Sequence, residues 1–228
     1  MIGLKAVTLT LGSQAGPVEI LKGIDLAVGA GETVSLVGPS GSGKTSLLMV
    51  IAGLERATSG QVSVGGVDYA GRSEDELARL RRDSVGIVFQ DFHLVPTMTA
   101  QENVAIPLEL AGARDAWKRA AGALDSVGLG HRLTHYPGQL SGGEQQRTAL
   151  ARAVVAKPSI LLADEPTGNL DGQTGQHIID LLFSLRAENG ATLLLITHDP
   201  VLAGRCSRQV GLADGQIVKD NQQTAAVA

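Results

Sequence analysis

The sequence predicts an α/β fold in which a mainly parallel sheet is covered by helices on both faces. Short apolar runs with the character of buried strands alternate with helical patterns along the chain, as in sheets whose two faces are both covered. The section up to about residue 70 is richer in strand signal, which predicts an additional antiparallel layer. The strand-like runs are residues 7–11, 33–37, 61–64, 85–89, 159–163 and 192–197.

Helical patterns lie between and after these strands, and several begin with recognisable capping residues. Three starts carry a capping box, in which Ser or Thr precedes Glu by three positions: Ser73 with Glu76, Thr99 with Glu102, and Ser141 with Glu144. The predicted helices are residues 44–52 (ending at Gly53), 74–82, 101–111, 116–127, 142–156, 174–188 and 201–206.

Two local signals refine these elements. Pro107 lies within a helical pattern and predicts a kink or an early stop. Near the end of the chain, Asp214-Gly215 separates two strand-like runs, 208–213 and 216–219, which predicts a hairpin.

The order of the elements predicts one domain with a helical insertion. Residues 91–157 contain only helical and loop patterns between two strands. We therefore expect the α/β core and its antiparallel part in residues 1–90 and 158–220, with a helical subdomain in 91–157. The polar residues 221–228 are expected to form a disordered tail.

Composition restricts the partners and the compartment. The 228 residues carry a formal net charge of -4, without the basic surplus typical of a nucleic-acid binder, so no nucleic-acid partner is expected. The single cysteine, Cys206, cannot form an internal disulfide and suits a reducing compartment. The start shows no signal-peptide pattern, and the apolar runs are too short to span a bilayer. We expect a cytoplasmic protein that reaches a membrane only through a partner.

A glycine-rich loop between the strand at 33–37 and the helix at 44–52 matches G-x-x-x-x-G-K-[ST]. In this context main-chain N–H groups turn toward phosphate oxygens, and the helix N-terminus favours negative charge. Lys44 is expected to reach the β- and γ-phosphates, and the Thr45 hydroxyl to bind Mg²⁺. A glycine-rich turn that happens to precede a helix is the alternative. The predicted nucleotide-binding residues are Gly38, Pro39, Ser40, Gly41, Ser42, Gly43, Lys44, Thr45 and Ser46.

Two carboxylates follow the apolar strand at 159–163. Asp164 is expected at the carboxyl edge of the sheet, where it can hold the water shell of the metal. Glu165 is then placed to polarise an attacking water as general base. Taken alone, the pair is equally well explained as a strand end followed by a helix cap.

A third motif, Leu140-Ser141-Gly142-Gly143-Glu144-Gln145-Gln146-Arg147, precedes that strand. It contains a capped helix start, but its two glycines each cost a helix about 1 kcal/mol relative to alanine. Exposed N–H groups at a helix start suit a phosphate better than they suit stability.

Together these motifs resemble those of the ATP-binding cassette (ABC) ATPases over nearly the whole chain. The Leu-Ser-Gly-Gly-Glu sequence is a variant of the family signature. Further family elements follow in order: Gln90 in the Q-loop, Asn169-Leu170-Asp171 in the D-loop, and the switch histidine His198. The resemblance implies a P-loop NTPase fold of the ABC type, with a RecA-like core, an antiparallel β subdomain and an inserted helical subdomain.

The resemblance also implies the reaction and the role of each residue. It implies Mg²⁺-dependent ATP hydrolysis by two copies that dock head to tail around two ATP molecules. Gln90 would contact the metal and the attacking water, and His198 would hold the γ-phosphate, beside Lys44 and the two carboxylates of the same chain. The residues implied to act on the nucleotide of the opposite copy are Ser141, Gly142 and Gly143, and Asp171 is counted among the nucleotide-binding residues.

Within the family, the details resemble the bacterial LolD/MacB branch. They are Gly86-Ile87-Val88-Phe89-Gln90, Asn103-Val104 and the run from Asp164 to Asp171. This branch implies a separate membrane permease with a large periplasmic domain, and a place on the inner face of the cytoplasmic membrane. Residues 91–98 are the expected docking segment for that partner. One departure is Leu11, which stands where the family usually has an aromatic residue that stacks on adenine.

Two other functions compete with this one. A soluble ABC ATPase acting on chromosomes would need a long coiled-coil insertion, but residues 91–157 show no sustained heptads. Ribosome-acting members usually join two cassettes in one chain, whereas this chain has one. A GTP-driven switch would carry an Asn-Lys-x-Asp motif, which is not found in the sequence.

Overall fold

The computed structural model describes residues 1–13 and 16–222, which divide into two compact units. The first comprises Met1–Arg81 with Thr192–Ala228, and the second comprises Arg82–Ala191. The boundary falls inside helix α2 (Glu74–Ser84). It differs from the predicted limits of the helical subdomain, because strand β6 (Val85–Val88) and helix α6 (Gly172–Asn189) both pack against helix α5 (Gly142–Val154) of the second unit.

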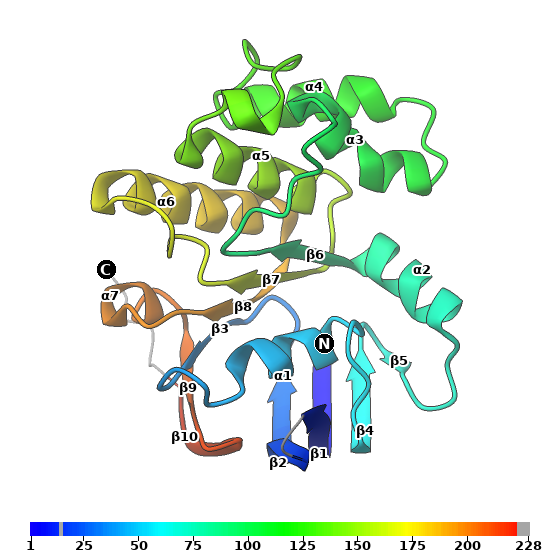
Figure 1. The fold of residues 1–228 in the computed structure, drawn as a ribbon, viewed down its shortest axis with the longest axis vertical. Helices are drawn as coiled ribbons and strands as arrows, with labels where there is room; N and C mark the ends of the chain where they lie inside the picture. The colour runs from blue at the N-terminus through cyan, green and yellow to red at the C-terminus, as the bar shows by residue number, and fades with distance from the viewer. Residues whose placement is uncertain (14–15, 223–228) are drawn as a thin grey trace. The chain divides into compact units, whose positions relative to one another are not determined.

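The first unit contains an antiparallel sheet with the strand order β2-β1-β4-β5. It confirms the predicted antiparallel layer, and α1 (Lys44–Ile51) packs against it (Figure 1). The strands are β1 (Ile2–Ser13), β2 (Gly16–Val28), β4 (Ser59–Val64) and β5 (Val67–Asp68).

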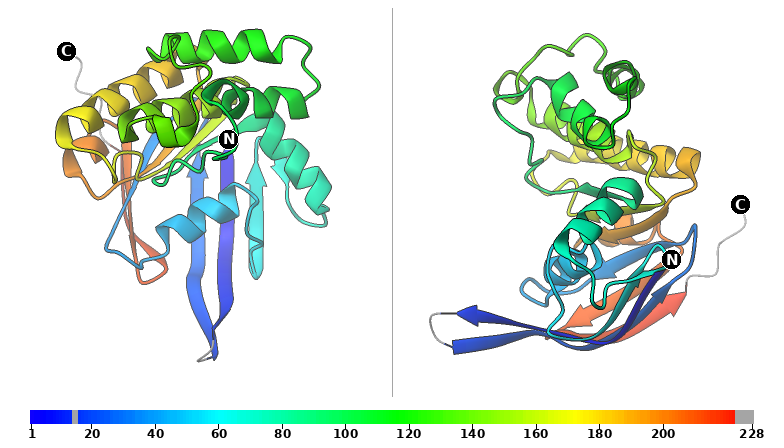
Figure 2. Two further views of the ribbon diagram at one scale, coloured as in Figure 1. Left: turned by 45° about the horizontal axis from the view of Figure 1, so that its top comes forward. Right: turned by 90° about the vertical axis from the view of Figure 1, so that its right-hand side faces the viewer.

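β1 and β2 form a hairpin that projects from the rest of its unit (Figure 2), where the sequence predicted only one strand, at residues 7–11. Ile2, Leu4, Val7 and Leu9 of β1 are buried, but the alternation breaks between Leu4 and Val7, where the register shifts. Ala6 lies in this bulge with a φ of 47°. Such register shifts interrupt the two-residue period, which explains why β2 was not predicted and why β1 was predicted to begin only at Val7.

The same unit also contains four strands in the order β10-β9-β3-β8, of which β10 is antiparallel to β9. β3 pairs in parallel with β8 and with β9, which confirms the predicted parallel core. Every residue of β8 is buried, as expected for a strand covered on both faces. The strands are β3 (Thr33–Val37), β8 (Thr192–Ile196), β9 (Arg208–Ala213) and β10 (Gln216–Gln222), and a short helix, α7 (Pro200–Ala203), precedes β9.

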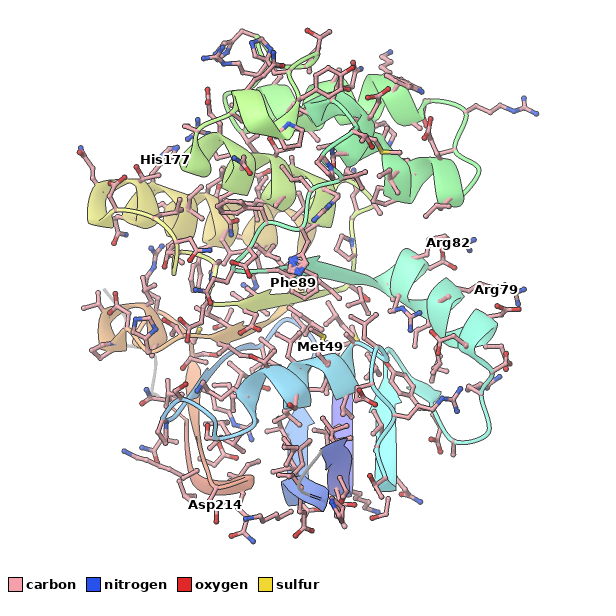
Figure 3. All side chains as sticks on the ribbon, viewed as in Figure 1. Met49, Arg79, Arg82, Phe89, His177 and Asp214 are labelled. Atoms are coloured by element: carbon pink, nitrogen blue, oxygen red, sulfur yellow. The ribbon has the colours of Figure 1, made fainter. Side chains whose placement is uncertain are left out.

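The predicted hairpin at Asp214-Gly215 is confirmed. Both residues have positive φ, 47° and 74°, as the tightest hairpin turns require, and Asp214 lies at the turn in Figure 3. β10 continues to Gln222, which pairs with Arg208. Residues 221 and 222 therefore belong to the strand and not to the tail. The two strands are also joined by an ion pair of 2.6 Å between Arg208 and Asp220. The rest of the predicted tail, residues 223–228, lies outside the described residues.

The second unit joins two parallel strands to a group of helices. β6 pairs in parallel with β7 (Ile160–Asp164). Residues 91–157 contain no strand in the structure, as predicted, and α3, α4 and α5 pack on one another. Besides α5 and α6, the unit contains α3 (Ala100–Leu110), α4 (Ala116–Ser126) and the 3₁₀ turn η1 (Pro137–Gln139).

Local capping signals in the sequence are confirmed in both units. Thr99 and Ser141 each accept from the N–H of the glutamate three positions on, and each glutamate bonds back to the cap. Ser73 and Glu76 exchange the same bonds. The early stop at Pro107 does not occur, because α3 continues to Leu110. Proline cannot donate a main-chain hydrogen bond, but the Pro107 carbonyl still accepts from the Ala111 N–H at 3.2 Å, so the helical bonds continue after it.

Candidate functional site

The phosphate loop after β3 is held against neighbouring main chain. Gly43, the N-cap of α1, has a φ of 98° and offers no side chain to accept from the first helical N–H groups. A Cβ at Gly38 would lie 1.9 Å from the carbonyl oxygen of Leu212, so no larger residue fits there. The Gly215 N–H bonds to the Ser42 carbonyl at 3.2 Å. The loop is therefore fixed in a shape that leaves helical N–H groups open to an anion.

Lys44 supports the same conclusion from its own surroundings. Its side chain is buried, and Nζ donates to the carbonyls of Gly38 at 3.0 Å and Pro39 at 2.8 Å. Among the described residues no carboxylate forms an ion pair with it. Ser42 Oγ is also buried and has no hydrogen-bond partner there. A buried ammonium that meets only neutral acceptors, beside an unpaired hydroxyl, fits a polyanion such as a triphosphate.

The residues expected to bind the metal and the γ-phosphate in this unit lie at one edge of its parallel strands. Leu36 of β3 is in register with Ile196 of β8, so the loop after β3 and the residues after β8 leave the same edge. His198 is exposed there, just ahead of α7, which Asp199 caps by accepting from Val201 at 2.7 Å. Thr45 is exposed and Ser46 half-buried at the start of α1.

In the second unit, the acidic strand end and Gln90 share an edge in the same way. Val88 of β6 is in register with Ala163 of β7, and both strands run parallel. Asp164 ends β7, and Glu165 follows with a φ of 43°. A non-glycine residue in this region costs on the order of 1–3 kcal/mol and persists only where its surroundings enforce it. The Gly168 N–H does so in part, donating to the Glu165 carbonyl at 2.9 Å.

Gln90 is tied to the D-loop. Its Nε2 donates to Asn169 Oδ1 at 3.2 Å, and Asn169 Nδ2 donates to the Gln90 carbonyl at 3.2 Å and to Asp91 Oδ1 at 2.8 Å. A Cβ on Gly168 would lie 2.7 Å from Gln90 Nε2. The structure thus brings the Q-loop and the segment after Glu165 into direct contact.

The signature sequence forms the start of α5. Ser141 is exposed at the N-cap, and Gly142 and Gly143 are the first two helical residues. The Ser141 N–H, with the Ser141 hydroxyl and Arg132, holds the pKa of Glu144 below its ordinary value. A Cβ on Gly143 would lie 2.6 Å from Thr174 Cγ2 of α6. Gly143 therefore also serves close helix packing, a reason that the sequence did not indicate.

Asp171 is the N-cap of α6. Its carboxylate accepts from the Thr174 N–H at 2.9 Å, and this bond lowers its pKa. Its side chain is exposed.

Three polar residues near the site were not among the predicted site residues. Asn103 is fully buried in α3 and bonds to the main chain of Val95 in both directions, at 2.7 and 3.1 Å. Arg152 of α5 donates to the carbonyls of Phe92 and His93, whose φ values are 60° and 49°. Burial lowers the pKa of the Arg152 guanidinium. Gln146 of α5 donates to the carbonyl of Phe89, which precedes Gln90, and to that of Pro166, which follows Glu165.

Helical spacing could have pointed to two of the three. Asn103 falls on the buried stripe of α3 with Ala100 and Val104, and Gln146 on that of α5 with Ala149 and Leu150. A polar residue on an apolar stripe needs a partner inside the protein.

The aromatic and histidine residues without a predicted role remain without one. Trp117 is half exposed, and its Nε1 donates to Glu109 at 2.9 Å. His177 lies exposed on α6 (Figure 3). The ring of Phe89 packs against that of His93, with the ring centroids 4.7 Å apart. His131 is exposed, and His135 Nε2 lies 3.1 Å from Arg132.

Comparison with known proteins places the chain. The family model described as ABC transporter matches residues 21–168. The chain belongs to the ABC transporter family.

Its relatives agree with the predicted branch. The chain is 51% identical to the ABC transporter ATP-binding protein YbbA of Escherichia coli (strain K12), over 92% of this chain and 93% of YbbA. It is 49% identical to the lipoprotein-releasing system ATP-binding protein LolD of Geobacter metallireducens, over 95% and 98% of the two chains. It is 46% identical to the macrolide export ATP-binding/permease protein MacB of Marinobacter nauticus, over 96% of this chain but 34% of MacB.

The fold has a close structural neighbour. The ATP-binding cassette MJ0796, in a dimeric post-hydrolysis state bound to ADP and Pi, matches with a TM-score of 0.91 at 39% identity. The match covers 99% of this chain and 100% of that one. The ABC-type P-loop fold is thereby confirmed, and the chain is the ATP-binding and ATP-hydrolysing subunit of an ABC transporter system. The relatives support this interpretation and not the soluble alternative.

Within the described residues, no helix combines the length and apolar character needed to cross a membrane.

Proposed function

We propose that the chain works as a head-to-tail dimer with a second copy of itself and drives a separate membrane permease of the LolD/MacB kind. The observation that carries this is the match to LolD over 98% of its length, together with the dimeric MJ0796 neighbour. The permease is expected to have a large periplasmic domain. In this arrangement the chain is cytoplasmic and lies against the inner face of the cytoplasmic membrane through its partner.

The proposed roles follow the family motifs. Lys44 neutralises the β- and γ-phosphates of ATP, and His198 holds the γ-phosphate as charge shifts. Glu165 accepts a proton from the attacking water, which Gln90 orients. Phosphoryl transfer of this kind depends mainly on positioning and charge stabilisation, so assembly of these groups by dimer closure can switch it on.

Mg²⁺ is the proposed metal. The donor set fits it, because Thr45 offers a hydroxyl, Gln90 an amide oxygen and Asp164 a carboxylate, all hard oxygen ligands. When bound, the ion neutralises charge that develops on the phosphate oxygens.

Ser141, Gly142 and Gly143 are proposed to bind the γ-phosphate held by the opposite copy. The exposed N-cap at Ser141 supports this role, because N–H groups of the first turn of α5 face outward from a helix start.

We expect the binding site to discriminate only weakly between the bases of ATP and GTP. Leu11 of β1 and its cross-strand partner Val18 of β2 are both exposed, at 37% and 46%, and offer an aliphatic surface instead of a ring. We predict that ATP and GTP bind with affinities within about tenfold of each other. Leu11→Tyr should strengthen ATP binding by about 2- to 10-fold through stacking. Equilibrium titration with both nucleotides measures this, and a hundredfold preference of the native chain for ATP contradicts it.

The docking segment for the permease is proposed to be residues 91–98. Phe92 and Leu94 are only half-buried, while Arg152 and Asn103 hold the main chain around them. We predict that Phe92→Ala with Leu94→Ala abolishes co-purification of the permease while leaving the ATPase activity of the isolated chain within about twofold. Val201→Ala, which removes an exposed apolar side chain elsewhere, is the control. Undiminished capture by the double variant would contradict the assignment.

A further inference from the structure

Gln146 is a buried polar side chain whose amide is only partly satisfied. It lies in the middle of α5 and is 0% exposed. Its Nε2 donates to the Pro166 carbonyl at 2.7 Å and to the Phe89 carbonyl at 3.4 Å. Its Oε1 is buried and has no hydrogen-bond partner among the described residues. An unsatisfied buried acceptor costs about 1–3 kcal/mol, which offsets much of the stability that the two donated bonds contribute.

The two carbonyls that Gln146 holds adjoin the proposed catalytic groups. Phe89 directly precedes Gln90, and Pro166 directly follows Glu165. Glu165 has the left-handed φ of 43°, a conformation that its neighbours must enforce. A donor fixed to the next carbonyl restricts that turn, because it limits rotation of the peptide group between Pro166 and Thr167.

Gln146 also connects these loops to the signature sequence. Ser141 caps α5 five residues earlier, which is about 7.5 Å along a helix. The intervening turn is continuous α-helix, in which the Gln145 N–H donates to the Ser141 carbonyl at 2.8 Å. A rigid helical segment therefore connects two places. One is Ser141, which is proposed to contact the nucleotide of the opposite copy, and the other is the pair of loops that act on this chain's own nucleotide.

We propose that Gln146 is a positioning residue that fixes Gln90 and Glu165 relative to the signature helix. When Ser141 contacts the ATP of the opposite copy, the position of Gln90 and Glu165 at this chain's own ATP changes with it. The two hydrolysis sites are thereby interdependent. This inference rests on the proposed function, because it takes the roles of Glu165, Gln90 and Ser141 from there.

The test replaces the amide by an apolar group of similar size. For Gln146→Met we expect kcat to fall about tenfold, with the Kd for ATP unchanged within about twofold, because no group on ATP is lost. The Hill coefficient for ATP in steady-state hydrolysis should fall toward 1. Thr148→Val is the matched control, since it removes a buried polar bond on the same helix that does not reach either loop. That variant should keep the kcat and Hill coefficient of the native chain.

A second variant, Gln146→Glu, tests the hydrogen bond itself through the pH dependence of kcat, which a packing role alone would not change. In Gln146→Glu the carboxyl can replace the lost donor only while protonated, and burial favours the protonated form. The ratio of the kcat of Gln146→Glu to the kcat of the native chain, measured at the same pH, should therefore be higher at pH 6 than at pH 8.

Three results would overturn the inference. They are a native kcat in Gln146→Met, an equal loss in Thr148→Val, and a relative kcat for Gln146→Glu that does not rise toward pH 6. Glu165→Gln separates this failure from that of the proposed function. If that variant hydrolyses ATP normally, the proposed roles themselves are wrong; if it is inactive while Gln146→Met is normal, only the role of Gln146 is.

Discussion

Glu165→Gln is expected to lower kcat for ATP hydrolysis by on the order of 10²–10⁴-fold, the contribution typical of a general base. The amide keeps the size and hydrogen-bonding reach of the carboxylate but cannot accept a proton from water. The turn at Glu165 depends on main-chain bonds such as that from Gly168, which the substitution does not remove. Phosphate release from the purified variant measures the effect.

The same substitution should leave ATP binding intact and thereby accumulate the closed dimer. With hydrolysis blocked, ATP remains at both sites, and light scattering should show a dimer with ATP and a monomer without nucleotide. Glu188→Gln is the control, because Glu188 is an exposed carboxylate of α6 bonded only to Ser184 at 3.1 Å among the described residues. A Glu165→Gln variant with native turnover would exclude Glu165 as the general base.

Lys44→Met is expected to weaken ATP binding by on the order of 10- to 100-fold, because hydrogen bonds to charged groups contribute about 1.5–3 kcal/mol. The unliganded fold should tolerate the change. Lys44 is buried, and its ammonium meets only the carbonyls of Gly38 and Pro39, so removing the charge also removes its desolvation cost. Titration with ATP and the thermal midpoint without nucleotide measure the two effects.

The contrast between these two measurements is the informative result. Lys118→Met, at an exposed position on α4, should change neither quantity. Loss of ATP binding together with a large fall in the thermal midpoint would instead assign Lys44 to maintenance of the loop. Native affinity for ATP in Lys44→Met would exclude its role at the phosphates.

The sequence by itself determined the features that depend on neighbours within one turn. Three capping boxes and the Asp214-Gly215 hairpin formed as predicted, and α1 stops just before Gly53, because the donors and acceptors of each feature lie within a few residues of each other. The short apolar strands were found for a similar reason, since burial on both faces needs an unbroken apolar run.

The tertiary structure decided the features that depend on distant main chain. β2 was missed because bulges break its period, and its pairing with β1 fixes it instead. Gly143 proved to lie against Thr174, a contact between two helices that spacing along the chain cannot show.

Motif residues could be predicted from the sequence, whereas the side chains that bind the main chain of the motif loops could not. Motif residues such as Lys44 and Glu165 are identifiable because the chemistry requires their types at fixed spacing. Gln146, Arg152 and Asn103 instead bind carbonyl or N–H groups of loops up to 60 positions away in the sequence. Every residue presents such main-chain groups, so no residue type marks the partner. Only the packing of α3 and α5 against those loops determines which carbonyls these side chains meet.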